Sequence, residues 1–199
     1  MKRQRKKRGY ADCDCWEMRN YFATTLSKMF KELAKMKHGA PQAEFEEFTS
    51  FPEKWVEENS KVLLEQKKKK GYEEKLDLYG EEKYFDRWWF VLMRIAFCLE
   101  ESDIDKDNII NEYEEEYHKQ VFGERDDKTS FKKWWENSFE VVETDKKGKP
   151  KLYRLKTNEP DKDLEEKFWE REKEIEHYRE ACKDEAFDLI KKYFYYLWD

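Results

Sequence analysis

One long amphipathic segment at the C-terminal end constrains the fold of this chain more than any other feature. Within residues 161–199, apolar side chains recur at steps of three or four, which places them on one face of a helix. They are Ile175, Tyr178, Cys182, Ala186, Leu189, Tyr193 and Leu197. The segment closes on an aromatic run, 193–198. Because exposing so many aromatic side chains to water would be unfavourable, we expect this helix to dock into a core.

The composition indicates a folded chain despite its high charge. Its 199 residues suit one domain. A hydrophobic content of 38% and a charged content of 44% are typical of disorder. A net charge of only −6 and an aromatic content of 17% oppose that interpretation, since each buried aromatic removes ~150–250 Å² from water. We therefore expect a few large side chains to build the core.

Two further helices and one hairpin complete the expected fold. Helices are predicted over 14–37 and 81–101. The apolar residues expected to face the core from the first are Trp16, Phe22, Leu26, Met29, Leu33 and Met36. Two alternating runs around a glycine-containing loop predict a β-hairpin at 138–157, with strands near 139–156, which should lie on the helices. The fold class is mainly α: residues 9–199 form a single compact domain of three long helices, short helices and this hairpin.

The first eight residues are strongly basic. Their cations are Lys2, Arg3, Arg5, Lys6, Lys7 and Arg8. We expect residues 1–8 to be a flexible arm, which either binds nucleic-acid phosphates in a salt-sensitive way or serves as a solubilising tail. Because these six charges belong to a net charge of −6, the remaining chain carries −12. Such an acidic body would suit a basic groove on another protein. No stretch approaches the ~18 apolar residues of a membrane helix.

An acidic segment, 103–114, resembles an EF-hand loop. Oxygen donors at loop positions 1, 3, 5, 7 and 12 wrap a calcium ion in that motif, and here these positions are Asp103, Asp105, Asp107, Ile109 and Glu114. Asn108 stands where the sharp turn prefers glycine. The alternative is that these side chains cap a helix beginning at Ile109. Calcium is the one cofactor that the pattern suggests.

Catalytic motifs are absent from the sequence. It contains three histidines but no nucleophile elbow, phosphate-cradling glycine loop or His-Glu-x-x-His, so we expect no enzyme. Cys13 and Cys15 lack the spacing of a zinc knuckle. Four cysteines in a chain of this length indicate reduced thiols in a cytosol.

Aromatic residues also indicate contact surfaces. The chain has 14 Phe, 12 Tyr and 8 Trp, more than a small core easily hides, and Tyr and Trp are enriched at interfaces. The alternative is that they compensate for few aliphatic residues. We expect contact roles for Tyr113, Tyr117, Trp134 and Trp135.

Several of these segments together are similar to a known family. The segments are Gly9-Tyr10 with Asp12 and Trp16, the helix end His38-Gly39-Ala40-Pro41, Trp89-x-x-Leu92-Met93-x-x-Ala96-Phe97, and the final Leu189-Ile190-x-x-Tyr193-Phe194-x-x-Leu197-Trp198-Asp199. They resemble small helical proteins encoded by bacteriophages and prophages. That resemblance supplies no catalytic residues. It implies a protein acting in the cytoplasm of a host bacterium or carried in the virion.

Three functions follow as hypotheses. The first is a non-catalytic phage accessory protein that binds a host or virion protein. The second is a nucleic-acid-associated protein acting through residues 1–8, and the third is a calcium- or small-ligand-binding module using 103–114. No membrane association is expected, and the sequence leaves the oligomeric state open.

Overall fold

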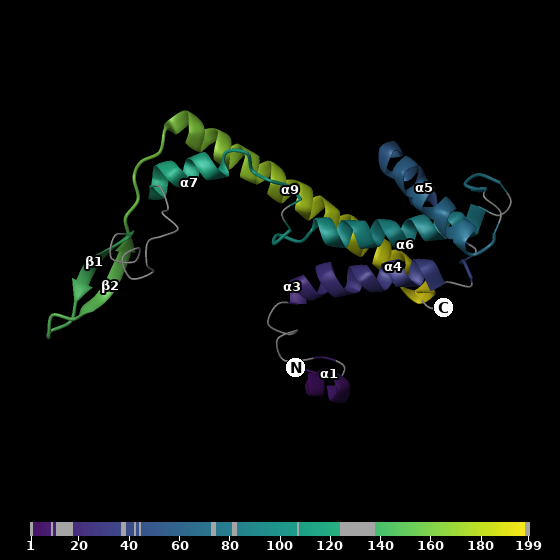
Figure 1. The fold of residues 1–199 in the computed structure, drawn as a ribbon, viewed down its shortest axis with the longest axis horizontal. Coiled ribbons are helices and arrows are strands. Elements are labelled where there is room, and N and C mark those ends of the chain that lie inside the picture. The colour runs from purple at the N-terminus through teal and green to yellow at the C-terminus, as the bar shows by residue number, and fades with distance from the viewer. Residues whose placement is uncertain are drawn as a thin grey trace. The chain divides into compact units, whose positions relative to one another are not determined.

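The chain is mainly helical with one antiparallel hairpin, as the sequence predicts. The computed structural model describes residues 2–8, 10, 18–36, 39–41, 43, 45–72, 75–80, 83–106, 108–123 and 138–197 (Figure 1). Two compact units emerge where the sequence analysis expects one domain: a first unit, 1–108 with 178–199, and a second unit, 109–177. The long helix α9 (Lys162–Tyr193) begins in the second unit and ends in the first.

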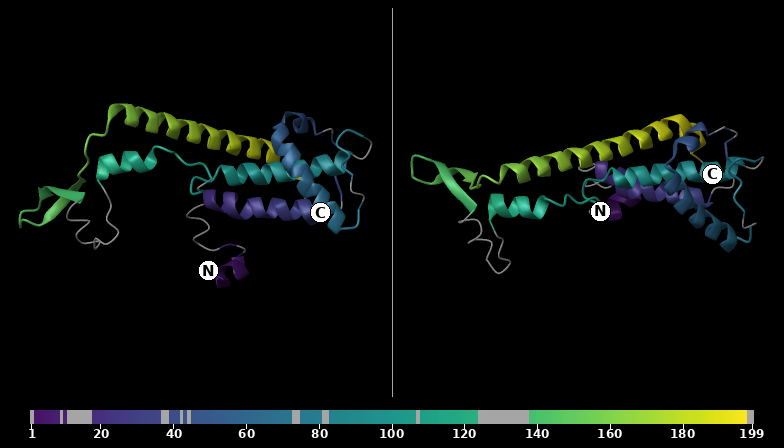
Figure 2. Two further views of the ribbon diagram at one scale, coloured as in Figure 1. Left: turned by 45° about the horizontal axis from the view of Figure 1, so that its top comes forward. Right: turned by 90° about the horizontal axis from the view of Figure 1, so that it is seen from above.

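Helix α6 (Lys83–Glu101) forms the centre of the first unit. Its side chains are buried almost all round, including every one from Trp88 to Leu92, as expected of a helix surrounded by other elements. Helix α4 (Ser27–Met36) runs beside it (Figure 2). The 3₁₀ helix η2 (Glu46–Ser50), helix α5 (Glu53–Lys69) and the C-terminal half of α9 contribute the other core residues.

Polar groups at the start of α6 are satisfied rather than exposed. The carboxylate of Asp86 is buried and accepts hydrogen bonds from Lys67 Nζ at 2.7 Å and from the backbone N–H of Asp77 at 2.8 Å. The indole N–H of Trp89 donates to Gln66 on α5 at 3.0 Å. These bonds remove the penalty of burying polar atoms and attach α5 to α6.

The first long helix turns a partly different face to the core than the sequence predicts: Phe22, Leu26 and Leu33 pack against the core as expected, although only partly buried. It consists of α3 (Met18–Tyr21), a π-helical turn η1 (Phe22–Leu26) and α4. Met29 and Met36 are more than half exposed, contrary to expectation. The buried residues are Ala23, Ser27, Phe30 and Ala34. A π turn is wider than an α turn, so it rotates the following face away from strict 3.6-residue spacing. Trp16 lies outside the described residues.

The apolar stripe of α9 is largely confirmed, but the aromatic end is not buried as predicted. Ile175, Cys182, Ala186, Leu189 and Tyr193 are buried, whereas Tyr178 is partly exposed. The short helix η3 (Phe194–Tyr196) exposes all three aromatic side chains. Leu197 packs against the core, and Trp198 lies outside the described residues. The three aromatic side chains between Tyr193 and Leu197 therefore stay outside the core, while both flanking residues contact it.

The second unit contains helix α7 (Glu114–Phe122), strands β1 (Phe139–Thr144) and β2 (Pro150–Leu155), and the first half of α9. The hairpin occurs where the sequence predicts it, with Phe139 paired to Leu155. Its strands are exposed on both faces except at those two residues, so the expectation that it lies on the helices is wrong. Val141, Val142 and Tyr153 are therefore exposed on the strands.

Candidate functional site

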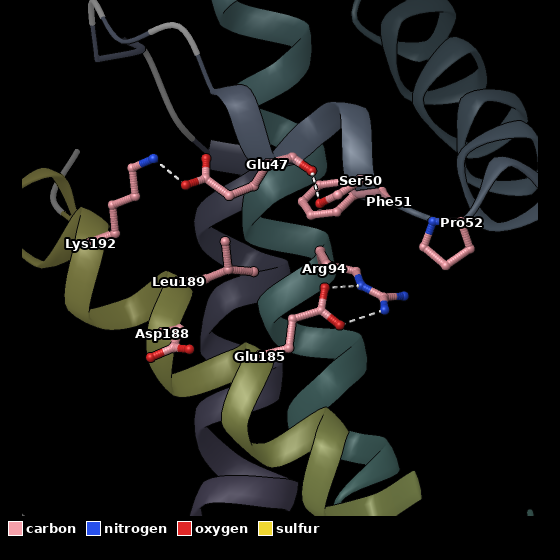
Figure 3. A pocket seen from close by; sticks show the side chains of 9 residues that line it. All are labelled: Glu47, Ser50, Phe51, Pro52, Arg94, Glu185, Asp188, Leu189 and Lys192. Atoms are coloured by element: carbon pink, nitrogen blue, oxygen red, sulfur yellow. Dashed lines mark hydrogen bonds and ion pairs between the residues drawn. The ribbon is translucent and has the colours of Figure 1, made fainter.

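A charged cavity of about 630 Å³ opens in the first unit between η2, α6 and α9 (Figure 3). Its lining residues are Glu47, Ser50, Phe51, Pro52, Arg94, Glu185, Asp188, Leu189 and Lys192. The volume falls in the range of small-molecule sites. Five of the nine lining residues are charged, so the ligands that the cavity could bind depend on which of these charges are already paired.

Arg94 is the most buried charge of the cavity. Its Nε and Nη2 donate to the two carboxylate oxygens of Glu185 at 2.6 and 2.7 Å, a bidentate pair between α6 and α9. Its guanidinium also stacks over Phe51, Trp55 and Phe97 at 5.1–5.8 Å from the ring centres. Burial alone would lower the pKa of Arg94, but its hydrogen bonds to Glu185 outweigh burial and raise it.

Glu47 carries the second pair. Its carboxylate is bonded to the ammonium of Lys192 and accepts a hydrogen bond from Tyr193 Oη at 2.7 Å. Burial would raise the pKa of Glu47, but the hydrogen bonds from Lys192 and Tyr193 prevail and lower it. Phe45 precedes η2 with a left-handed backbone (φ 48°), rare for a bulky residue, and is buried against Trp88 and Tyr193.

These pairs leave one unpaired carboxylate, that of Asp188, which makes no hydrogen bond or ion pair with the described residues. Two cations neutralise two anions within the cavity wall. The main role of these two ion pairs is therefore structural: they hold the end of α9 against α6 and η2.

A second candidate surface lies on the second unit, where aromatic side chains of α7 and α9 meet. Tyr117 stacks on Phe168 with ring centres 4.1 Å apart and planes 3° apart. Trp169 packs edge-on against both rings. His118 contacts Phe122 and Phe168. We call Tyr117, His118, Phe122, Phe168 and Trp169 the aromatic cluster. Trp169 and Phe122 are 49% and 50% exposed, so its outer side faces solvent.

The segments that carry this aromatic cluster are rich in carboxylates. Residues 109–123 and 158–177 contain thirteen acidic and five basic side chains. Arg171 pairs with Glu112 and Glu174, and Glu172 accepts a hydrogen bond from Asn111 at 2.8 Å. Seven carboxylates form no ion pair or hydrogen bond within the described part of the chain. They are Glu115, Glu159, Asp163, Glu165, Glu166, Glu170 and Glu176. The resulting surface combines exposed aromatic area with uncompensated negative charge.

Only one of the four residues predicted to contact a partner lies in the aromatic cluster. Tyr117 belongs to the aromatic cluster, and Tyr113 is half-buried just before α7. Trp134 and Trp135 lie outside the described residues. Phe168 and Trp169 were not among the predicted contact residues. Their pattern could have indicated a contact surface, because two adjacent aromatic residues stand in a stretch of α9 that is otherwise mostly charged.

The acidic loop is organised by its own hydrogen bonds. Asp103 accepts a hydrogen bond from the backbone N–H of Asp105 at 3.1 Å. The Lys106 and Asn108 side chains bind the buried carboxylate of Glu101 at 2.7 and 2.6 Å. Asp107 lies outside the described residues, and Ile109 is half-buried.

The following helix begins at Glu114 rather than at Ile109, and the side chain of Asn111 accepts a hydrogen bond from the backbone N–H of Tyr113 just before it. Among the described residues no group of three or more metal-binding side chains converges. Calcium binding stays a prediction.

The basic N-terminus, expected to be a flexible arm, is helical over Lys2–Arg8 (α1). Arg3, Arg5, Lys6 and Lys7 are exposed on it. This arrangement concentrates positive charge on two helical turns.

Comparison with known proteins supplies no relative: no known family, no curated protein and no solved structure matches the chain. Within the described residues, no helix has the length and apolar character needed to cross a lipid bilayer.

Proposed function

We propose that this protein is a non-catalytic binding protein whose aromatic cluster and surrounding carboxylates dock a basic segment of another protein. The observation that carries this proposal is the exposure of Trp169 and Phe122 on helices rich in unpaired carboxylates. Exposed aromatic residues are the usual energetic anchors of interfaces. Negative charge around them selects a positively charged partner and speeds its approach.

The chemistry of the surface supports a particular kind of partner segment. It should carry lysines or arginines for the carboxylates and an aliphatic or aromatic side chain for the exposed edge of Trp169. Arginine suits both, because its guanidinium pairs with carboxylates and stacks on indole. The resemblance to phage proteins supports a host or virion protein as this partner, with binding in the bacterial cytoplasm or in the particle.

Titration with defined peptides tests the proposal. A helical peptide rich in arginine and leucine should bind, an acidic peptide of equal length should not, and added salt should weaken binding. Trp169→Ala should weaken it by at least about tenfold, the effect of losing an interface anchor. Trp169→Phe should retain most of the affinity.

A matched control uses Tyr72, which is 66% exposed in the first unit. Tyr72→Ala should leave peptide affinity unchanged. The proposal fails if Trp169→Ala binds as tightly as the parent protein, or if Glu165→Lys with Glu166→Lys does not weaken binding.

A second candidate function is attachment to nucleic acid through α1. The concentration of cations on this helix supports it, since each phosphate contact contributes salt-sensitive affinity. Deleting residues 2–8 should abolish retention on DNA or RNA at low salt. Under the first proposal, the same deletion should leave peptide binding intact.

A further inference from the structure

Two hydrogen-bonded contacts define how α6 and α9 face each other in the first unit. Arg94 binds Glu185 at 2.6–2.7 Å, and Tyr178 Oη donates to Glu101 at 3.2 Å. The two contacts are seven residues apart on each helix but occur in opposite order. The helices are therefore antiparallel here, and the residues between these contacts lie opposite one another.

Cys98 and Cys182 occupy the positions between these two contacts. Cys98 is four residues after Arg94, and Cys182 is four residues after Tyr178, spacings that keep each cysteine on the face turned to the other helix. Both cysteines are free and buried. In this register each thiol lies close enough to the other to shift its pKa.

The two thiols differ in their chemistry. The interaction with Cys98, assisted by Tyr178 and by the positive charge of Arg94, lowers the pKa of Cys182 to about 7 despite its burial. The same interaction, together with burial, raises the pKa of Cys98. Cys182 suits the role of nucleophile, because the thiolate is the reactive form and this residue is 5% exposed whereas Cys98 is fully buried. Cys98 is then positioned as the resolving thiol. So small an exposed fraction favours a small oxidant.

We propose that Cys98 and Cys182 form a redox modification site that a small peroxide converts to an intramolecular disulfide. The Cys182 thiolate attacks one oxygen of hydrogen peroxide, the O–O bond breaks, and Cys182 becomes a sulfenic acid. The hydroxide released takes up the proton that the thiol lost, giving water. The sulfur of Cys98 then attacks that of Cys182, the S–O bond breaks, and the hydroxide leaves with the Cys98 proton as a second water.

The reaction consumes two thiols and one peroxide and yields one disulfide and two waters. Its product ties α9 covalently to α6 and restricts the unfolded chain. This site lies in the first unit and does not depend on the proposed docking surface.

Peroxide treatment followed by alkylation and peptide mapping tests the site. The experiment uses a Cys13→Ser, Cys15→Ser background, so that only the two buried thiols remain. We expect a linked peptide pair containing Cys98 and Cys182, loss of two hydrogens from the intact mass, and a higher melting temperature that a reductant reverses. Two freely alkylated thiols after treatment, or a mixture of separately overoxidised thiols, would overturn the proposal.

The single variants separate the two roles. Cys98→Ala should stop the reaction at a sulfenic acid on Cys182, detected with a dimedone probe. Cys182→Ala should slow peroxide consumption by at least about tenfold, because the remaining thiol is protonated. Equal consumption by both variants would contradict the assignment. Near-ultraviolet circular dichroism checks that each variant is folded, and the mapping of the parent protein decides the case if either is not.

Discussion

At the scale of single residues, α9 is held in place by a few partly buried ion pairs. Arg94 reaches Glu185 across the helix interface, and Lys192 with Tyr193 reaches Glu47 on η2. Removing one partner of such a pair destabilises the folded protein, because the other charge is left partly buried without compensation.

Replacing Arg94 should destabilise the protein measurably. Arg94→Met removes a bidentate pair and three cation–π contacts and leaves Glu185 without its partner. We expect a loss of about 1–3 kcal/mol in unfolding free energy, below the figure for a fully buried pair because Glu185 is about one-third exposed. Chemical denaturation measures it. Arg171→Met, which removes a more exposed pair, should cost clearly less. Equal losses would show that burial does not matter here.

The stability contribution of Glu47 should depend on pH. Its folded-state pKa is lowered, so its contribution is present above the unfolded pKa of about 4.3 and is lost as pH falls through the folded value. The difference in unfolding free energy between the parent protein and Glu47→Gln should therefore be largest near neutral pH and shrink below about pH 4. Urea titrations over this range measure it. Glu46→Gln, at an exposed neighbour, serves as the control, and a difference that does not change with pH would contradict the assignment.

At the scale of elements, side-chain exposure changes sharply where α9 ends. Tyr193 is 2% exposed among Phe45 and Trp88, whereas Tyr195, two residues later, is 86% exposed. The same residue type thus has opposite roles within one helical turn.

This boundary predicts very different costs for two identical substitutions. Tyr193→Ala should lower the unfolding free energy by about 3–5 kcal/mol, the usual cost of deleting a buried aromatic ring. Tyr195→Ala should change it by less than about 0.5 kcal/mol. Thermal and urea unfolding measure both. Similar effects of the two substitutions would contradict the burial of Tyr193 and the exposure of Tyr195.

At the scale of the whole molecule, the chain enters and leaves the second unit at neighbouring points of the first. Asn108 and Tyr178 both hydrogen-bond to Glu101, and Arg179 donates to the carbonyl of Lys106 at 3.3 Å. The two ends of the first unit's chain therefore lie close enough for a short connection.

Deleting the second unit should leave the first one folded. A variant that joins Asn108 to Tyr178 through a short Gly-Ser linker should unfold cooperatively, with a melting temperature within about 5 °C of the parent transition. The same variant should lose binding to the basic peptide. Calorimetry measures the first outcome and peptide titration the second. A deletion variant without a cooperative transition would show that the units fold only together.

Much of the first unit could be predicted from local pattern, and much of the functional surface could not. The stripes on 81–101 and 161–199 identify core residues such as Leu92 and Leu189, because spacing alone places them on one face. The rotation of 14–37 that exposes Met29 and Met36 could not be predicted, because the π turn at Phe22–Leu26 is not encoded in a regular period. The aromatic cluster depends on Tyr117 meeting Phe168, which are 51 positions apart.

The sequence by itself determined the helical class, the hairpin and the central place of two amphipathic helices, because each follows from spacing within one segment. Only the tertiary structure decided which side chains meet: Arg94 with Glu185, Cys98 with Cys182, and Tyr117 with Phe168. It also decided that Phe194–Tyr196 remain outside the core. The physical reason is that periodicity fixes the face a residue occupies, whereas its partner depends on the register and separation of helices distant in the chain.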